Sequence, residues 1–390
     1  MRILGIETSC DETAISIIEA KGGLKKPRFK VLSNTTISQI DIHAQYGGVF
    51  PMMAKREHSR NLIPILEKTL KESKLYSESN RKMISPTVEK ELRKILAREP
   101  ELLEQFITFI SKIKKPKLDA IGVTEGPGLE PALWVGINFA QALNLVWNLP
   151  IIPINHMEGH IFASLLEIQE ENKTGIKFPA LALLISGGHT QLVLIKDWMK
   201  YEVIGETRDD AVGEAYDKVA RMLSLPYPGG PAISKLAEID RGINKESKFQ
   251  LPRPMINTND FDFSFSGLKT AVLYTVKKLP EITEIIKQQI AREFEDSVIE
   301  VLTTKTKRAL EKHDIKSLIL GGGVSANEQI RKSIKESAKA YQNVSVFIPH
   351  KDLSTDNALM ISVATYLRIS KTQKIKGKKN IKASGNLRLK

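Results

Sequence analysis

The sequence predicts an α/β protein built of two lobes, and two observations carry that prediction. The chain has 390 residues, which is too long for one small core and favours two domains. Residues 2–18 and 179–195 also look like two copies of one unit. Each copy is a buried apolar strand, a turn of small polar residues and a β-branched strand, which together predict a hairpin. One such hairpin therefore stands at the start of each half.

The turns of these hairpins favour phosphate binding, because Gly and Ser let an anion approach backbone N–H groups closely. Two ordinary hairpins would explain each copy alone, but their similarity favours a duplicated phosphate-binding unit. A duplicated strand–turn–strand unit, with the active-site cleft between the lobes, is typical of the actin, Hsp70 and sugar-kinase (ASKHA) architecture. We therefore expect that fold class.

A third loop of the same kind follows the apolar segment 317–320. Three consecutive glycines, Gly321 to Gly323, allow a nucleotide to press against bare backbone. A helix is expected to begin near Ser325–Asn327, and its N-terminus favours anionic or polar groups. A plain turn is the alternative, although a plain turn needs one glycine rather than three.

Two histidines, His156 and His160, are spaced as i and i+4, which places them on one face of a helix. Two imidazoles so placed can bind a metal ion. An isolated match of this kind often arises by chance. Asp356, at the start of a late helix, could supply a third ligand; alternatively Asp356 or Thr355 could cap that helix.

The mixed-charge segment 205–218 is expected to be helical, with Asp209, Asp210, Glu214 and Asp217 at helical spacings. Such a run is usually a solvated face. Because Gly229 and Gly230 follow soon after, Asp217 could instead bind a ribose hydroxyl.

The chain is expected to divide into an N-terminal lobe, 1–177, and a C-terminal lobe, 178–370, with the final helix packing back towards the N-terminal lobe. Residues 78–115 are rich in Lys, Glu and Leu and have an amphipathic helical pattern, so they are expected to form a helical insertion. Residues 371–390 contain eight Lys or Arg and no acid. We expect this basic tail to be disordered, with electrostatic contact to RNA as the alternative.

The composition narrows the class of protein further. Apolar residues make up 42 % of the chain and charged residues 26 %, as in ordinary globular proteins. We expect no membrane-spanning segment and no targeting peptide, because residues 2–7 already have the pattern of a core strand. A single cysteine, Cys10, excludes an internal disulfide framework and favours a reducing compartment. The net charge of +13 favours an anionic partner, nucleic acid first, unless it reflects a lysine-rich proteome.

Taken together, the motifs are recognisable. They are Gly5–Thr13, His156–His160, Ser186–Thr190, Asp210–Lys218, Tyr227–Pro231, Phe263–Thr270, Gly321–Asn327 and Thr355–Asn357. In this order they closely resemble the bacterial TsaD family of tRNA N6-adenosine threonylcarbamoyltransferases, whose archaeal and eukaryotic relatives belong to the KEOPS complex. The resemblance runs from residue 1 to about residue 370, apart from the 78–115 insertion.

The resemblance implies a transfer reaction and a cytoplasmic enzyme, with the mitochondrial matrix as the alternative location. The threonylcarbamoyl group would leave threonylcarbamoyl-AMP and join N6 of the adenosine adjacent to the anticodon in tRNAs that read ANN codons. Implied partners are tRNA, a TsaB-like paralogue and a TsaE-like ATPase, with a TsaC/Sua5-type synthetase supplying the adenylate. The implied cofactor is one divalent metal ion, Fe²⁺ with Zn²⁺ as the alternative.

The resemblance also implies the roles of individual residues. It implies that His156, His160 and Asp356 hold the metal, and that Asp11 and Glu12 are needed for catalysis. It implies that the adenylate is lined by Leu184, Ile185, Ser186, Gly187 and Gly188. The ribose and base would be contacted by Asp217, Gly230 and Asn327. No residue is identified as the general base. Two positions differ from the family pattern, Glu125 and Ser234. Some family members have a carboxylate residue where this chain has Ser234.

Three rival functions remain to be weighed. A metallopeptidase would need a glutamate directly after the first histidine, where this chain has Met157; Glu158 points elsewhere on a helix. An actin-like kinase or ATPase would use the glycine loops but has no need of a histidine pair. A non-catalytic tRNA-binding scaffold would explain the charge but neither the loops nor the metal ligands.

Overall fold

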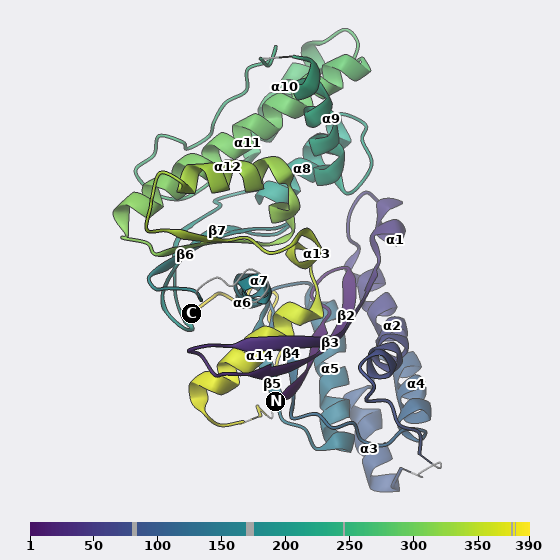
Figure 1. Cartoon of the computed structure of the whole chain (residues 1–390). Helices are drawn as coiled ribbons and strands as arrows, with labels where there is room; N and C mark the ends of the chain where they lie inside the picture. The colour runs from purple at the N-terminus through teal and green to yellow at the C-terminus, as the bar shows by residue number, and fades with distance from the viewer. Residues whose placement is uncertain (80–83, 169–174, 245, 376, 379) are drawn as a thin grey trace. The chain divides into compact units, whose positions relative to one another are not determined.

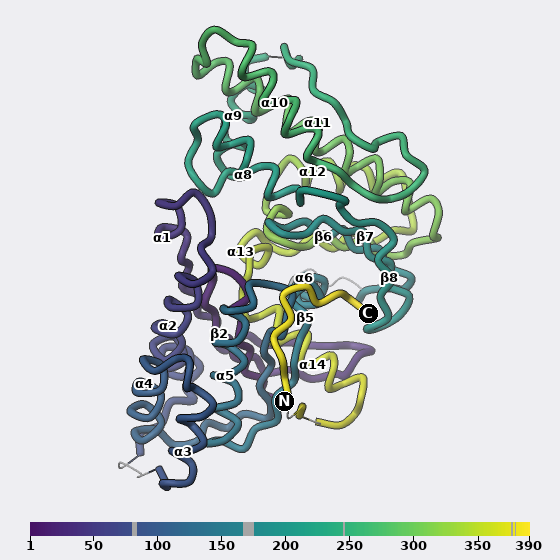
Figure 2. Tube along the Cα trace, turned by 180° about the vertical axis from the view of Figure 1, so that it is seen from behind, coloured from purple at the N-terminus to yellow at the C-terminus, as the bar shows by residue number. Residues whose placement is uncertain are grey.

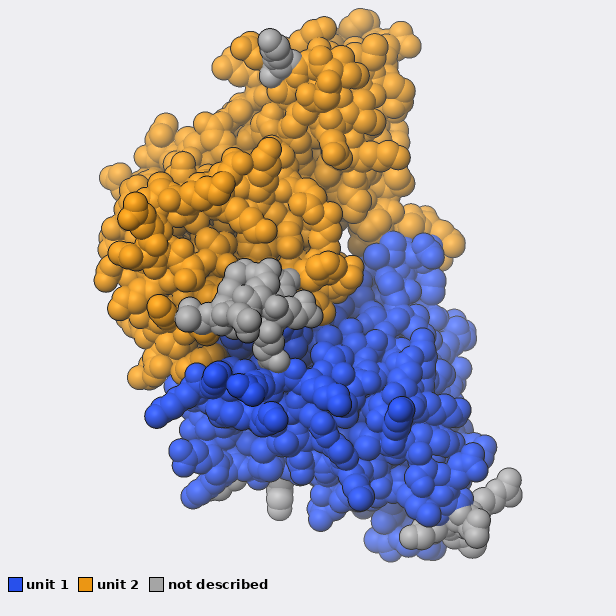
Figure 3. Space-filling model, viewed as in Figure 1, with its two compact units in different colours: residues 1–43, 49–169, 356–389 blue, residues 44–48, 170–355, 390 orange. Residues whose placement is uncertain are grey.

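The computed structural model describes the chain except residues 80–83, 169–174, 245, 376 and 379 (Figure 1). The chain forms two compact units (Figure 3). Unit 1 contains residues 1–43, 49–169 and 356–389, and unit 2 contains residues 44–48, 170–355 and 390. Each unit is built around one five-stranded sheet.

The sheet of unit 1 has the strand order β3-β2-β1-β4-β5. Its strands are β1 (Arg2–Glu7), β2 (Glu12–Lys21), β3 (Arg28–Ser38), β4 (Ala120–Gly126) and β5 (Ile151–Asn155). β1 and β2 form the predicted antiparallel hairpin, in which Gly5 lies opposite Ser16. On its other side β1 pairs in parallel with β4, and β4 pairs in parallel with β5.

The sheet of unit 2 repeats this topology, with the strand order β8-β7-β6-β9-β10. Its strands are β6 (Ala180–Ile185), β7 (Thr190–Asp197), β8 (Lys200–Glu206), β9 (Ser317–Gly321) and β10 (Ser345–Phe347). β6 and β7 form the second predicted hairpin, and β6 pairs in parallel with β9. In both sheets the first strand is central, flanked by an antiparallel hairpin partner and by a parallel strand. The predicted α/β fold with an internal duplication is therefore confirmed.

Helices cover both faces of the first sheet (Figure 1). The helices of unit 1 are α1 (Ile40–Ala44), α2 (Pro51–Glu72), α3 (Pro86–Ile95), α4 (Pro100–Ile110), α5 (Glu130–Trp147), α6 (His156–Ala163), α7 (Leu165–Ile168) and α14 (Ala358–Thr372). α2 and α5 pack on one face, and α14 lies on the opposite face across β1, β2 and β4. The core of the unit is formed by the apolar side chains of the strands together with those of α2 and α5.

The predicted insertion, 78–115, contains α3 and α4, although its residues 80–83 lie outside the described part of the chain. Leu92 on α3 and Phe106 on α4 are fully buried, and the Phe106 ring meets the edge of Phe139 on α5 at 5.9 Å. The two helices therefore extend the core of unit 1.

The helices of unit 2 are α8 (Val212–Met222), α9 (Gly229–Ile243), α10 (Ser266–Lys278), α11 (Glu284–Lys312), α12 (Glu328–Ala338) and α13 (Lys351–Ser354). The prediction that 205–218 is helical is wrong for its first half, because β8 continues to Glu206 and α8 begins only at Val212. Asp209 lies between them and accepts hydrogen bonds from the backbone N–H groups of Phe265 and Ser266.

The prediction of a disordered tail is also wrong for the part of 371–390 that the structure describes. α14 continues to Thr372, and residues 377, 378 and 380–389 belong to unit 1 (Figure 2). Ile381 is only 3 % exposed within the core of that unit. The count of basic residues predicted disorder because it gave no weight to the apolar residues between them.

Candidate functional site

The two histidines lie on α6, as their spacing predicts. Asn155 caps this helix by accepting hydrogen bonds from the backbone N–H groups of Met157 and Glu158. Because Asn155 also ends β5, the cap fixes the helix directly to the edge of the sheet. His156 and His160 are both buried, with 6 % and 1 % of their surface exposed.

Asp356 reaches these histidines because α14 lies unusually close to the sheet. A Cβ atom on Gly5 of β1 would stand 2.5 Å from the carbonyl oxygen of Ala358, so only glycine fits there. Gly159, between the two histidines, leaves room for side chains of α14, since a Cβ there would be 3.0 Å from Met360 Cγ. The close packing carries the start of α14, and Asp356 just before it, to the histidine pair.

Neither Asp356 nor Thr355 caps α14, so the alternative that one of them is the helix cap is wrong. Asn357 is the cap, and its side chain accepts a hydrogen bond from the N–H of Met360. The carboxylate of Asp356 is consequently available to the histidines.

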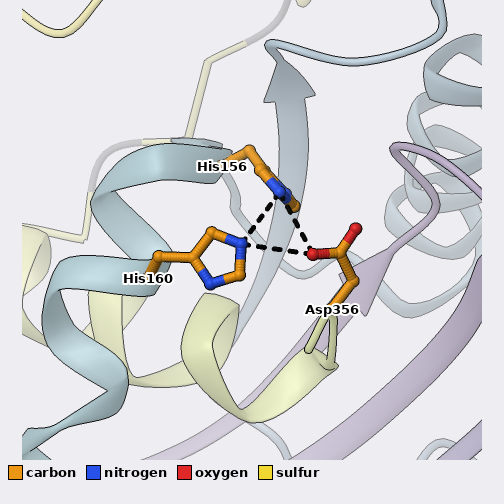
Figure 4. A group of neighbouring side chains, drawn as sticks. All are labelled: His156, His160 and Asp356. Atoms are coloured by element: carbon orange, nitrogen blue, oxygen red, sulfur yellow. Dashed lines mark hydrogen bonds and ion pairs between the residues drawn. The ribbon is translucent and has the colours of Figure 1, made fainter. Parts of the chain in front are cut away.

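The three side chains meet at one point (Figure 4). The Nε2 atoms of His156 and His160 are 3.1 Å apart, and Asp356 Oδ1 lies 3.3 Å and 3.2 Å from them. Ligands that bind one metal ion at about 2.0–2.2 Å are themselves separated by roughly 3.0–3.5 Å. The three atoms therefore have the spacing of one face of a coordination shell.

Glu7 and Ser9 orient His156 by contacting Nδ1, the ring nitrogen that does not face Asp356. The Nδ1 atom of His156 lies 3.2 Å from Glu7 Oε2 and 3.2 Å from Ser9 Oγ. Glu7 is fully buried and also accepts hydrogen bonds from Thr124 Oγ1 and from the N–H of Ser9. A carboxylate bound to the far nitrogen of a metal-binding histidine fixes the tautomer that leaves Nε2 free for the metal.

Asp11 and Glu12, the predicted catalytic pair, lie in and just after the turn of the first hairpin. Asp11 is 8 % exposed. Burial, together with Asp356 and Asp11, raises the pKa of Glu12 to about 10. Asp356 and Glu12 are thus close enough to influence each other, and both belong to unit 1.

The charges of this region fit a bound cation. Burial disfavours the charged forms of Glu7, Glu12 and Asp356; His156 counteracts burial at Glu7 and Asp356, whereas Asp356 and Asp11 add to it at Glu12. Burial disfavours the charged form of Asp356, but His156 and His160 outweigh it and lower the pKa of the carboxyl. Two imidazole nitrogens and one carboxylate oxygen are a donor set that transition metals and zinc accept.

Glu158 takes no part in this cluster, as the helical spacing predicts. Its carboxylate is fully buried and accepts hydrogen bonds at 2.7 Å and 2.6 Å from the guanidinium of Arg368 on α14. A glutamate so bound is a poor general base, which argues against the metallopeptidase.

The predicted adenylate-binding residues belong to unit 2. Gly187 and Gly188 form the turn between β6 and β7, which is closed by a hydrogen bond from the N–H of Ser186 to the carbonyl of His189. No other atom lies within 4 Å of where a Cβ would be on either glycine. Leu184 and Ile185, however, have fully buried side chains in the core, so only their backbone can line a ligand. The family resemblance names the positions but does not distinguish side chain from backbone.

The triple-glycine loop follows β9 as predicted. Gly322 has a φ of +89° and passes so close to the carbonyl of Ile185 that a Cβ there would stand 2.4 Å from the oxygen; this explains a glycine here. The next regular element is a short 3₁₀ turn, and α12 begins at Glu328 with Asn327 as its cap.

Asn327 is held by a side chain that the sequence did not indicate. Its Nδ2 donates to Ser234 Oγ at 2.7 Å and to Glu295 Oε1 at 2.6 Å, while its Oδ1 accepts from the N–H of Ile330. Glu295 is 1 % exposed and also binds Arg241. A carboxylate is therefore present beside Ser234, but it comes from α11, more than sixty positions along the chain. No local pattern could have found it.

Asp217 and Gly230, the remaining predicted residues, lie close to each other. Asp217 Oδ1 accepts a hydrogen bond at 2.7 Å from the N–H of Gly229, which fixes the start of α9 against α8. Gly230 has nothing within 4 Å of where a Cβ would be. The N-terminus of α9 is thus presented on the same unit as the two glycine turns.

Fold and site together define a duplicated α/β protein with a candidate histidine–aspartate metal site. A model of the TsaD family, tRNA N6-adenosine threonylcarbamoyltransferase, matches residues 30–81 and 97–363. The chain belongs to this family. Between the two matched stretches, the unmatched residues 82–96 lie within the segment 78–115 that was predicted to be an addition; residues 1–29 and 364–390 are also outside the match.

Curated relatives agree with this assignment. The tRNA N6-adenosine threonylcarbamoyltransferase of Bacillus cereus is 42 % identical over 363 residues, which cover 93 % of this chain and 90 % of the relative. The enzyme of the same name from Persephonella marina is 40 % identical over 375 residues, covering 95 % and 91 %.

Among solved structures, the chain is similar to the ROK hexokinase from Thermus thermophilus, with a TM-score of 0.45, 11 % identity and coverage of 95 % of this chain and 100 % of that one. It is also similar to HypF from T. kodakarensis, with a TM-score of 0.49, 16 % identity and coverage of 72 % and 44 %.

Proposed function

We propose that this transferase moves the threonylcarbamoyl group from threonylcarbamoyl-AMP to N6 of the adenosine adjacent to the anticodon in tRNAs that read ANN codons. The observation that best supports the proposal is the cluster of His156, His160 and Asp356 in a chain of this family. A kinase or a passive scaffold has no use for such a cluster.

The metal proposed for this site is Fe²⁺, with Zn²⁺ as the alternative, and its ligands would be His156 Nε2, His160 Nε2 and Asp356 Oδ1. Such an ion polarises a carbonyl oxygen and binds a carboxylate, as the threonylcarbamoyl group requires. Glu7 Oε2, 3.2 Å from His156 Nδ1, would favour the tautomer that carries its proton on Nδ1 and leaves Nε2 for the metal, and both histidines are buried.

The glycine turns of unit 2 are proposed to bind the AMP portion. Ser186, Gly187 and Gly188 offer backbone N–H groups to the phosphate, and the backbone of Leu184 and Ile185 lies beside them. The N-terminus of α9 at Gly230, fixed by Asp217, and the cap residue Asn327 are proposed to bind the ribose and base. AMP leaves as an anion, and backbone N–H groups stabilise that charge as it develops.

Asn327 can only accept further hydrogen bonds, because both hydrogens of its amide are used by Ser234 and Glu295. Its proposed partner is therefore a donor, such as a ribose hydroxyl or the adenine amino group. Asp11 and Glu12 remain proposed as residues required for activity. Because its pKa is raised, Glu12 is protonated near neutral pH before a cation binds.

Proposed partners are tRNA, a TsaB-like paralogue and a TsaE-like ATPase, with the adenylate made by a TsaC/Sua5-type synthetase. Among the described residues, no helix is long and apolar enough to cross a membrane. The proposed location is the bacterial cytoplasm.

Nucleoside analysis tests this proposal. Unmodified tRNA is incubated with the chain, its partner proteins and threonylcarbamoyl-AMP. The tRNA is then digested to nucleosides, whose masses are measured by mass spectrometry. Adenosine carrying the threonylcarbamoyl mass at the position next to the anticodon supports the proposal. Unmodified adenosine, in a reaction where a known family member succeeds, contradicts it.

A further inference from the structure

The C-terminal segment of unit 1 is bound to the edge of the sheet by backbone hydrogen bonds. We call residues 377–389, apart from 379, the strap (Figure 2). The N–H of Lys378 donates to the carbonyl of Ile151 on β5 at 3.0 Å, and the N–H of Ser384 donates to the carbonyl of Glu125 at 2.9 Å. In the opposite direction, the N–H of Gly128 donates to the carbonyl of Gly385 at 3.1 Å. The strap therefore crosses β5 and the segment 125–128, which is the end of β4 with the turn that follows it and is hereafter called the loop.

Close packing accompanies these hydrogen bonds. Ile381 is 3 % exposed and Leu389 is 9 % exposed. Gly126 in the loop has a φ of +144°, and any Cβ there would collide with the carbonyl of Ser384. Glu125, which departs from the family pattern, forms an ion pair with Lys378 at 3.4 Å. The acid that looked out of place in this loop thus has its partner on the strap.

The same loop touches the metal centre on its other side. The N–H of Leu129 donates to the carbonyl of Ser9 at 2.7 Å, and a Cβ on Gly128 would stand 2.6 Å from that same oxygen. Ser9 is in turn 3.2 Å from His156 Nδ1. Just before the loop, Thr124 donates to Glu7, the other partner of His156.

We infer that the strap is a positioning element for the metal centre. The strap fixes the position of residues 125–128 through its backbone hydrogen bonds. These residues in turn fix the position of Ser9. Ser9 and Glu7 then keep His156 in the orientation that binds metal. The contacts form one path within unit 1, from Gly385 to Gly128, from the adjacent Leu129 to Ser9, and from Ser9 to His156, while Ser384 binds the nearby Glu125. This inference rests on the proposed metal site, and it assigns a structural role to residues that the charge pattern linked only to RNA.

Two substitutions at one position isolate this role. Ser384→Pro removes the N–H that binds Glu125, whereas Ser384→Ala keeps that N–H and changes only the side chain. A second pair compares a buried position with an exposed one. Ile381→Asn disrupts the packed face of the strap, whereas Lys382→Asn changes the exposed residue next to it. All four variants are made in the full chain and checked for folding by circular dichroism.

Two measurements are made on each variant: hydrogen exchange over residues 124–129, and the Kd for Co²⁺ from its absorption spectrum. We expect Ser384→Pro and Ile381→Asn to speed exchange and to raise the Kd by about tenfold, the usual effect of losing support behind a ligand. We expect no change in Ser384→Ala or Lys382→Asn.

An unchanged Kd in both Ser384→Pro and Ile381→Asn overturns the inference, whether or not exchange becomes faster. Failure of the unaltered chain to bind Co²⁺ contradicts the proposed metal site instead. Should Ile381→Asn fail to fold, Ser384→Pro decides the matter alone.

Discussion

Glu7 is the residue that most favours the proposed metal site over a chance meeting of two histidines and an aspartate. It is fully buried, it belongs to the first strand, and it reaches His156 across 149 positions of sequence. Burying a carboxylate is costly unless its hydrogen bonds are satisfied, and Thr124, Ser9 and His156 satisfy those of Glu7. The protein thus carries a buried charge whose geometry serves to orient one imidazole.

Glu7→Gln tests this role. Glutamine keeps the size of the side chain but removes the negative charge that holds the Nδ1–H of His156. We expect metal affinity to fall by about 10- to 100-fold, as is usual for such partners. Calorimetric titration with Co²⁺ measures this, and Glu19→Gln, at a partly exposed carboxylate, is the control. Equal affinities in both variants would mean that Glu7 only fills space.

The charge of His156 predicts a pH dependence. Burial disfavours its protonated form, but Asp356 and Glu7 outweigh burial and raise the pKa of His156 well above its usual value. Near neutral pH the histidine is therefore protonated before metal binds, and the metal must displace that proton. Because the pKa of His156 is raised, we expect metal affinity to rise with pH through the neutral range, with one proton released. Titrations in buffers of different ionisation enthalpy count the protons, and a count of zero contradicts this account.

At this scale the sequence predicted residue types well and long-range partners poorly. His156 and His160 are recognisable by spacing, and Asp356 by family resemblance. Glu7 and Glu295 were not assigned a role, because their contacts join distant parts of the chain. The direction of a side chain was equally hidden, as Leu184 and Ile185 show, because their side chains are fully buried in the core.

Among the elements, α14 matters most for the metal centre, because it delivers Asp356. Its approach depends on glycines at Gly5 and Gly159, where a larger residue would meet α14 itself. These glycines lie in a strand and a helix, where glycine weakens the element by itself. Their presence is explained by the close contact that they allow.

Gly5→Ala should therefore push α14 away from the sheet. The added methyl group would meet the backbone of Ala358, and we expect a loss of about 1–3 kcal/mol in the free energy of unfolding together with weaker metal binding. Gly242→Ala is the control, since nothing lies within 4 Å of a Cβ at that helical position. Chemical denaturation and Co²⁺ titration give both quantities; an unchanged Gly5→Ala variant would show that α14 adapts freely.

The predicted elements failed where charged residues, rather than apolar residues, were the guide. Residues 371–390 have eight basic residues, but Ile381 and Leu389 anchor them to unit 1. Residues 205–218 are charged at helical spacings, yet β8 and a turn occupy the first half. By contrast, the two hairpins and the α6 helix follow clear patterns of apolar residues or caps, and these predictions are confirmed.

For the whole molecule, the net charge of +13 is the feature that concerns tRNA. Exposed lysines on and near the strap, such as Lys374 and Lys382, are available to bind phosphate groups. We expect replacement of both by alanine to weaken tRNA binding and to lower the salt slope of log Kd by roughly one for each lysine that binds a phosphate. Filter binding at several salt concentrations measures the slope, with Lys68→Ala as an exposed control on α2. An unchanged slope would leave these lysines without a role in tRNA binding.

The overall architecture was the most predictable property of the chain. The two segments 2–18 and 179–195 each form a hairpin, and each hairpin belongs to a sheet of the same strand order. A duplicated unit leaves two similar patterns in the sequence, so each supports the interpretation of the other. The metal centre then depends on contacts within unit 1 that the topology brings together.

The most direct test of the central claim is incorporation of labelled threonine into unmodified tRNA by the unaltered chain and by His156→Ala. Both are supplied with ATP, bicarbonate, the synthetase and the partner proteins. We predict incorporation by the unaltered chain and a loss of at least about 100-fold in the variant, with a normal circular dichroism spectrum showing that it is folded. Incorporation at an equal rate by a folded His156→Ala protein would contradict the claim that this cluster holds the metal used in transfer.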